Sequence, residues 1–117
     1  MVKPHKQVDI LAEIQRVLDI EIEALQSARD SLTDHFVRAV EAIAACKGQI
    51  IVTGIGKSGI IANKIAATFR STGTPATFLH AAEALHGDAG IIRPEDVVLA
   101  IGKSGETVEL EFTTPRV

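Results

Sequence analysis

Two copies of the tetrapeptide Gly-Lys-Ser-Gly are the part of this chain best suited to chemistry. The first copy spans residues 56–59 and the second spans residues 102–105. Lysine ammonium groups, serine hydroxyls and the free N–H groups of a glycine turn that opens a helix all bind phosphate oxygens. Each copy shortly follows a run of aliphatic and β-branched residues, at 50–53 and 97–101, which is typical of a buried parallel strand. The pattern predicts that both copies lie at the carboxyl edge of one parallel sheet and hold a small phosphorylated molecule.

Two other phosphate-binding motifs fit less well. A nucleoside triphosphate loop needs a further glycine upstream at a fixed spacing, and Ile51 and Val97 stand at those positions. Residues 54–59 satisfy the G-x-G-x-x-G pattern of dinucleotide sites. Such a site also needs an acidic residue at the end of the next strand, where this chain has Leu79 and His80. A sugar phosphate held between two loops is therefore favoured over a nucleotide.

The composition disfavours several classes of function. The chain has 117 residues, of which 46% are hydrophobic, and a formal net charge of −3. It has four Phe but no Trp or Tyr, so platforms for stacking nucleic-acid bases are nearly absent, and the net charge argues against a polyanionic partner. The single cysteine, Cys46, allows no internal disulfide and favours a cytoplasmic location. We expect neither a membrane-spanning segment nor a signal peptide.

The hydrophobic spacing predicts an α/β domain. We expect an αβα sandwich around a parallel sheet of the flavodoxin or Rossmann type, with about three strands and two N-terminal helices. Residues 1–48 would form a helical segment used for packing or as an oligomer interface, and residues 49–117 the first part of a ligand-binding domain. We expect helices over residues 8–28, from Ser31 or Thr33 to Cys46, over residues 59–71 and after the second loop. We expect strands over residues 49–53, 76–79 and 97–101. Residues 80–90 are expected to form a short helix or loop.

We expect no metal site. His5, His35 and His80 have no partner at a metal-ligand spacing. His80 and His86 lie close in sequence, but no cysteine or second set of acidic groups accompanies them. The histidines are therefore assigned to structure or to acid–base chemistry.

Several segments together resemble the sugar isomerase (SIS) domain. They are residues 52–59, residues 66–69 and residues 71–75. Residues 83–88 (Glu-Ala-Leu-His-Gly-Asp) and 104–107 (Ser-Gly-Glu-Thr) narrow the resemblance to the D-arabinose 5-phosphate isomerases, which feed Kdo synthesis for lipopolysaccharide and capsule. The resemblance runs from the first helix to the end of the chain. It implies an SIS-type αβα fold and the interconversion of D-ribulose 5-phosphate and D-arabinose 5-phosphate with no cofactor.

The resemblance also implies how the phosphate is held. Many family members have a serine where this chain has Gly102, so one phosphate hydroxyl is lost and the glycine amide would partly replace it. The residues expected at the phosphate carry a hydroxyl, a lysine ammonium or a glycine amide: Gly56, Ser58, Ser71, Thr72, Lys103, Ser104 and Thr107.

Three further positions match active-site groups of the family: Lys57, His86 and Glu109. An aldose–ketose isomerase opens the sugar ring, moves a proton between C1 and C2, and stabilises an enediolate, which takes a base, a hydrogen-bond donor and a positive charge. Glu109 is the expected base, near the start of the helix after the second loop. His86 would assist ring opening or polarise an oxygen, and Lys57 would offset negative charge. The alternatives are a solvated glutamate, a structural histidine and a surface lysine.

The resemblance implies a homotetramer with sites at subunit interfaces, for which the N-terminal helices would be suited. Family members usually continue into a pair of CBS domains, draw a further acid and a histidine from later sequence, and have about five strands. The alternatives are a non-catalytic sugar-phosphate-binding module or fragment, an isomerase of another phosphosugar, and nicotinamide binding. The poised groups His86 and Glu109 favour catalysis, because a binding module has no use for a base.

Overall fold

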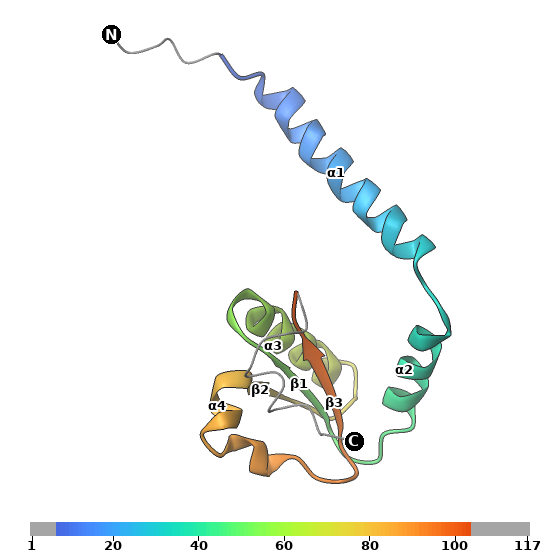
Figure 1. Ribbon diagram of the computed structural model, residues 1–117, viewed down its shortest axis with the longest axis vertical. Helices are drawn as coiled ribbons and strands as arrows, with labels where there is room; N and C mark the ends of the chain where they lie inside the picture. Colours follow the sequence, from blue (N-terminus) through green and yellow to red (C-terminus); the bar gives the residue numbers. More distant parts are fainter. Residues whose placement is uncertain (1–6, 104–117) are drawn as a thin grey trace. The chain divides into compact units, whose positions relative to one another are not determined.

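The computed structural model describes residues 7–103 (Figure 1). The chain divides into two compact units between Arg38 and Ala39, and each is described by itself. The elements in chain order are α1 (Ile10–Asp30), α2 (Asp34–Ala44), β1 (Ile50–Gly54), α3 (Gly56–Ser71), β2 (Ala76–His80), α4 (Ala81–Leu85), the 3-10 helix η1 (Asp88–Ile91) and β3 (Val97–Ile101).

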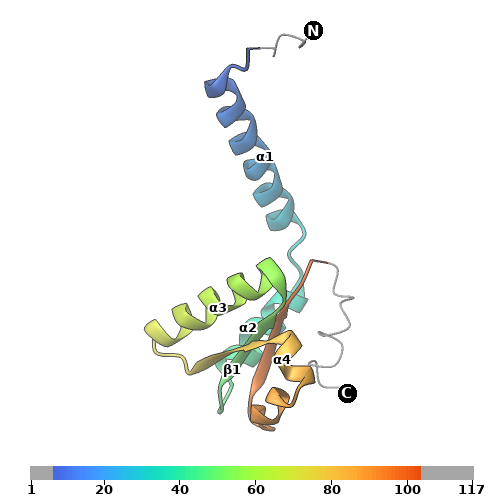
Figure 2. The same cartoon turned by 90° about the vertical axis from the view of Figure 1, so that its left-hand side faces the viewer.

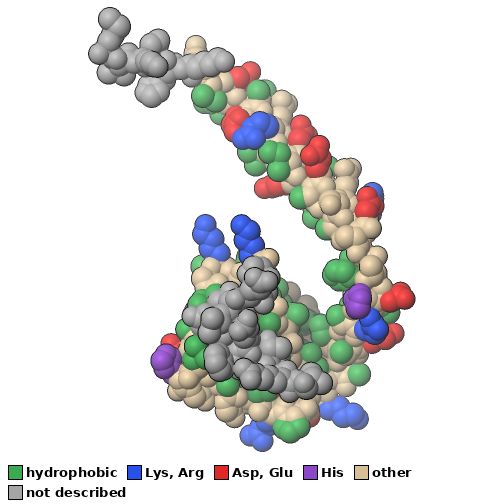
Figure 3. Space-filling view, viewed as in Figure 1, with side chains coloured by type: hydrophobic (Ala, Val, Ile, Leu, Met, Phe, Trp, Pro, Cys, Tyr) green, Lys and Arg blue, Asp and Glu red, His purple; other side chains and the backbone are tan. Residues whose placement is uncertain are grey.

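Helix α1 makes up most of the first unit. The Asp9 carboxylate accepts a hydrogen bond from the Ala12 N–H at 3.1 Å and so satisfies one of the free donors of the first turn. No residue of α1 is buried, although large apolar side chains recur along it at helical spacing. Hydrophobic and acidic side chains therefore share its surface (Figure 3). No helix in the described part of the chain is long and apolar enough to cross a membrane.

Three parallel strands form the sheet of the second unit, in the order β2-β1-β3. Ile50 at the start of β1 pairs with Ala76 on one side and Val97 on the other. Gly54 at the end of β1 pairs with His80 and Ile101, so all three strands end level. Every residue of β1 is buried, because the strand has a neighbour at each edge and packing on both faces. The parallel sheet expected from the sequence is confirmed.

The two faces of the sheet carry separate hydrophobic clusters. Ile50 and Val52 pack against Ala62 and Ala66 of α3 on one face. Ile51 points to the other face, where it meets Leu79 of β2, Ala84 of α4 and the partly buried Ile92 and Val98. Figure 2 shows α3 and α4 on opposite sides of the strands. This alternation along β1 creates the three layers of the expected α/β fold.

The ends of several elements differ from the expected ones. Helix α3 begins at Gly56 rather than at Gly59, so the first glycine loop is the first turn of the helix. Gly56 has a φ of 58°, a conformation that glycine adopts without strain, and this lets the chain pass from strand to helix almost at once. Strand β2 continues through His80, which was expected to start a short helix or loop. Helix α2 ends at Ala44, short of Cys46.

Asp96 connects the amino ends of β1 and β3. Its carboxylate accepts hydrogen bonds from the Gln49 N–H at 2.7 Å and from the Arg93 N–H at 2.8 Å. These two donors favour the ionised form, and they hold the pKa of Asp96 below its usual value. The Gly48 N–H donates to the Glu95 carbonyl at 3.2 Å beside them. These hydrogen bonds lie just ahead of the first residues of β1 and β3, and they help to set the register in which the two strands pair.

Candidate functional site

The pairing of β1 with β3 brings the two glycine loops to one place. Gly54 and Ile101 are partners in the ladder, so the residues that follow them leave the sheet side by side. From β1 the chain crosses through α3 to β2 on one side, and then returns through α4 and η1 on the opposite face to β3 on the other side. The strand order therefore reverses between β1 and β3, and in an open parallel sheet ligands bind outside the carboxyl ends of the strands at such a switch point. The topology therefore places Gly56 of the first loop and Gly102 of the second at the same edge of the sheet.

The first loop presents backbone donors at the start of α3. Ile55 is the N-cap residue, and no side chain caps the helix there among the described residues. The Gly59 N–H already donates to the Ile55 carbonyl at 3.2 Å, whereas the amides before it belong to the turn whose N–H groups have no partner within a helix. Lys57 is exposed and Ser58 is half-buried in this same turn. The arrangement suits an anionic oxygen ligand.

Two glycines let α3 approach the end of β1 this closely. A Cβ atom on Gly54 would lie 2.8 Å from the Ser58 carbonyl oxygen, and one on Gly59 would lie 3.0 Å from the Gly54 carbonyl oxygen. Both contacts are with backbone, which cannot swing aside as a flexible side chain does. The glycines are therefore required by packing between strand and helix, in addition to any contact with a ligand.

Of the second loop, the structure describes Gly102 and Lys103, and both are exposed. They directly follow Ile101, at the edge shared with the first loop. Ser104, Thr107 and Glu109 lie outside the described residues. Their roles at the phosphate and as the base stay predictions.

Ser71 and Thr72 do not lie near the first loop within one chain. They stand at the C-terminal end of α3, and Gly56 begins this helix of 16 residues, about 22 Å long at its regular rise. The Ser71 hydroxyl donates to the Thr68 carbonyl at 2.8 Å, and the Thr72 hydroxyl donates to the same oxygen at 2.9 Å. Their hydroxyls thus satisfy carbonyls of the last helical turn. The expectation that they sit beside Ser58 is wrong for a single chain, because α3 carries them to the opposite edge of the sheet.

His86 directly follows α4 as its C-cap residue, on the face of the sheet opposite α3. Its backbone N–H donates to the Glu83 carbonyl at 3.0 Å. Its imidazole is exposed, and no hydrogen bond joins that ring to another of residues 7–103. Lys57 and His86 therefore flank the sheet from different layers. Their convergence on one substrate stays a prediction.

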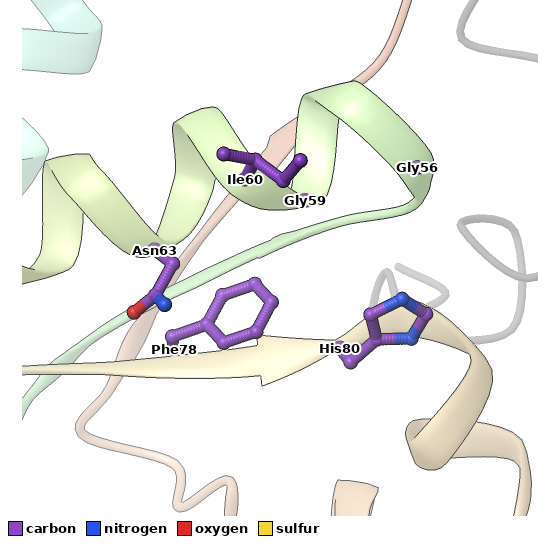
Figure 4. Close-up of a pocket in the computed structure, with 6 residues that line it drawn as sticks. All are labelled: Gly56, Gly59, Ile60, Asn63, Phe78 and His80. Carbon is purple, nitrogen blue, oxygen red and sulfur yellow. The ribbon is translucent and has the colours of Figure 1, made fainter.

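The structure also shows a pocket that the sequence did not indicate. It has a volume of about 240 Å³ and opens between the start of α3 and the end of β2 (Figure 4). The lining residues are Gly56, Gly59, Ile60, Asn63, Phe78 and His80. In the sequence, His80 was considered only as a metal ligand and as the residue that stands where a dinucleotide site has an acid. Its position at the end of a strand that finishes level with β1 is the signal that could have pointed to a site there.

Two further observations concern polar groups within residues 7–103. There is no group of three or more His, Cys, Asp or Glu side chains that could hold a metal ion. The hydroxyl of Thr53 is fully buried near the end of β1 and has no hydrogen-bond partner in this part of the chain. A buried hydroxyl without a partner costs about 1–3 kcal/mol.

An open parallel α/β sheet with glycine loops at its switch point defines a class of ligand-binding domains rather than one protein. Comparison with known proteins narrows the class. Residues 43–113 match the SIS domain family, and the chain belongs to that family. The fold and the resemblance expected from the sequence are confirmed.

Two relatives of high sequence identity are isomerases. The chain is 52% identical over 108 residues to arabinose 5-phosphate isomerase KdsD of Yersinia pestis, covering 92% of this chain and 33% of that protein. It is 50% identical over 102 residues to arabinose 5-phosphate isomerase GutQ of Escherichia coli K12, covering 87% of this chain and 32% of that protein. The chain thus spans about a third of the length of these relatives.

Two solved structures share the fold. One is the Escherichia coli CFT073 protein c3406 in complex with arabinose 5-phosphate, with a TM-score of 0.83 and 42% identity over 92% of this chain and 57% of that chain. The other is a putative phosphosugar isomerase involved in capsule formation from Bacteroides fragilis, with a TM-score of 0.80 and 41% identity over 89% of this chain and 56% of that chain. Both contain further sequence beyond the part matched here.

Proposed function

We propose that this SIS domain serves an enzyme that interconverts D-ribulose 5-phosphate and D-arabinose 5-phosphate. The observation that supports the proposal is the identity of 52% and 50% with two arabinose 5-phosphate isomerases. The two Gly-Lys-Ser loops at the β1–β3 edge add a chemical reason, because they offer amides, hydroxyls and lysines for a phosphate. The product would enter Kdo synthesis.

The phosphate would be held between the loops. Ser58 and the first amides of α3 would bind it from one side, and Lys103, Ser104 and Thr107 from the other. The helix start contributes a partial positive charge directed at the anion. Fixing the phosphate would hold C1 and C2 at a constant distance from the reacting groups.

The reaction moves one proton between two carbons. In the direction from aldose to ketose, the carboxylate of Glu109 would remove the proton from C2, and the released electron pair would form the C1–C2 double bond. Negative charge then develops on the C1 oxygen, where the Lys57 ammonium would stabilise it. The C2 hydroxyl then passes its proton to the C1 oxygen and becomes the carbonyl, while the protonated Glu109 returns its proton to C1. His86 would act earlier, by donating a proton to the ring oxygen or accepting one from the C1 hydroxyl as the sugar opens.

The test is to incubate the purified protein with D-ribulose 5-phosphate in D₂O and follow the reaction by proton NMR. Formation of D-arabinose 5-phosphate with deuterium at C2 would support the enediol route. Binding of the sugar phosphate with no exchange and no product would favour a non-catalytic sugar-phosphate module. Faster turnover of another ketose phosphate would assign the domain to a different phosphosugar isomerase.

We also propose that α1 packs against another copy of the chain, in a tetramer. Support comes from the exposed apolar side chains of α1, which include Ile10, Leu11, Ile14, Val17, Leu18, Ile22 and Leu25. An apolar surface of this extent marks an interaction site. A cytoplasmic location, expected from the single cysteine, is part of the same proposal.

A further inference from the structure

His80 is held in one orientation by its neighbours. Its Nδ1 accepts a hydrogen bond from the Ala82 N–H at 3.1 Å, which caps the start of α4. The ring meets Phe78 edge to face, with centroids 6.2 Å apart and planes at 88°. Gly59 of α3 is also close to the ring, since a Cβ atom there would be in ordinary contact with His80 Cδ2 at 3.8 Å. The imidazole is thus positioned more tightly than a surface side chain.

The cap of α4 also decides where the proton of the ring lies. A nitrogen that accepts a hydrogen bond carries no proton, so the neutral imidazole has its proton on Nε2. Figure 4 shows one ring nitrogen on the side of α4 and the other directed toward the first turn of α3, where Gly56 lies. Nε2 is therefore a hydrogen-bond donor at the rim of the pocket.

The pocket is suited to an uncharged, hydroxylated group. None of its lining residues carries a formal charge when His80 is neutral. Phe78 and Ile60 offer apolar surface for C–H groups, and Asn63 and His80 offer polar atoms for hydroxyls. Gly56 belongs both to this pocket and to the first glycine loop, so a ligand whose phosphate lies at the loop can extend into the pocket.

We propose that the pocket is the subsite for the sugar hydroxyls of the phosphorylated ligand, and that His80 Nε2–H donates to one of them. The proposal rests on the proposed function, because it concerns the same substrate. His80 would thus contribute to the affinity for the sugar and to the specificity among sugars. The two glycine loops would bind the phosphate.

The test uses the purified full-length protein and two substitutions that divide the roles of His80. His80→Asn keeps an acceptor for the cap of α4 but loses the donor at Nε2, since Asn is a strong N-cap residue. His80→Gln places an amide N–H near the position of Nε2 but gives up the cap. The matched control is His35→Asn, which makes the same substitution at an exposed histidine on a different element, α2. The ring of His35 contacts Arg38.

Dissociation constants for D-arabinose 5-phosphate and for inorganic phosphate are measured by calorimetry, and the thermal midpoint is recorded for each variant. We expect His80→Asn to weaken sugar-phosphate binding by about fivefold to tenfold, the usual worth of one neutral hydrogen bond. Phosphate binding should stay within about twofold, as should both affinities of the control. His80→Gln should lower the thermal midpoint yet bind the sugar phosphate better than His80→Asn.

Several results would overturn the proposal. Unchanged sugar-phosphate affinity in His80→Asn would remove Nε2 from the subsite while leaving the proposed function intact. An equal loss of phosphate affinity would place His80 at the phosphate instead. A wild-type protein that binds no phosphosugar would refute both proposals. If His80→Asn does not fold, the Nε2–H resonance of the wild-type protein is followed by NMR. It should move with D-arabinose 5-phosphate and not with phosphate, and no movement would also refute the subsite.

Discussion

Gly54→Ala tests whether the approach of α3 to β1 positions the first loop. The new methyl group would lie 2.8 Å from the Ser58 carbonyl oxygen, whereas ordinary contact begins at 3.4 Å. The first turn of α3 must therefore retreat by several tenths of an ångström, because the obstructing atoms are backbone. Overpacking of this kind costs about 1–3 kcal/mol. At about 2 kcal/mol, the thermal midpoint of a domain of this size falls by about 10 °C.

The assay is thermal unfolding by circular dichroism, together with titration of D-arabinose 5-phosphate at a temperature where the variant is folded. We expect a lower midpoint and weaker binding, since the retreating turn carries the amides and Lys57 with it. Gly90→Ala is the matched control: a Cβ atom there meets nothing within 4 Å and the backbone angle is ordinary. It should be neutral or slightly stabilising. A Gly54→Ala protein as stable as Gly90→Ala would refute the packing argument.

Three other substitutions address separate parts of the protein. The pKa of Asp96 is held below its usual value by the N–H of Gln49 above all, so its ionised form stabilises the fold at neutral pH and this contribution is lost as the pH falls below about 4. Asp96→Asn should therefore flatten the decline of the thermal midpoint below about pH 5, and an unchanged slope would contradict this. Glu109→Gln should lower kcat for isomerisation by about a hundredfold or more with little change in the dissociation constant of the sugar phosphate; an unaffected rate would mean that another group is the base. Leu18→Glu should reduce the mass measured by light scattering, because it puts a charge on the apolar face of α1. Ala12→Glu, about 120° around the helix from Leu18, should not, and equal masses for both variants would argue against α1 as the interface.

The strands could be predicted from the sequence because their signal is local. β1 and β3 are short aliphatic runs bounded by glycine or polar residues, and β2 follows the turn at residues 73–75. Burial at every position, which such runs also indicate, is seen in β1 but not in β2 or β3. The start of α3 could not be predicted in the same way. Gly56 to Gly59 look like a loop when taken alone, since glycine disfavours helix. Close packing against β1 explains why glycines stand there, and that contact is not visible in local sequence.

The site was predicted in part. The meeting of the two glycine loops followed from parallel pairing, which depends only on the strands and their order. Ser71 and Thr72 were misplaced because a hydroxyl near a glycine turn resembles a phosphate ligand whichever end of a helix it occupies. The orientation of His80 at the pocket could not be predicted, because it depends on the cap of α4 and on the contact with Phe78, and no sequence motif contains either.

The strand order has a consequence for how the domain forms. Pairing β1 with β2 closes a chain segment that contains only α3, whereas pairing β1 with β3 must also enclose β2, α4 and η1. Closing the longer segment costs more chain entropy, so we expect the β1-α3-β2 unit to form first and β3 to join it. The crevice between the glycine loops exists only after β3 has docked. A ligand bound there would therefore stabilise only the state in which β3 is paired with β1, and it would slow unfolding that begins with the release of β3.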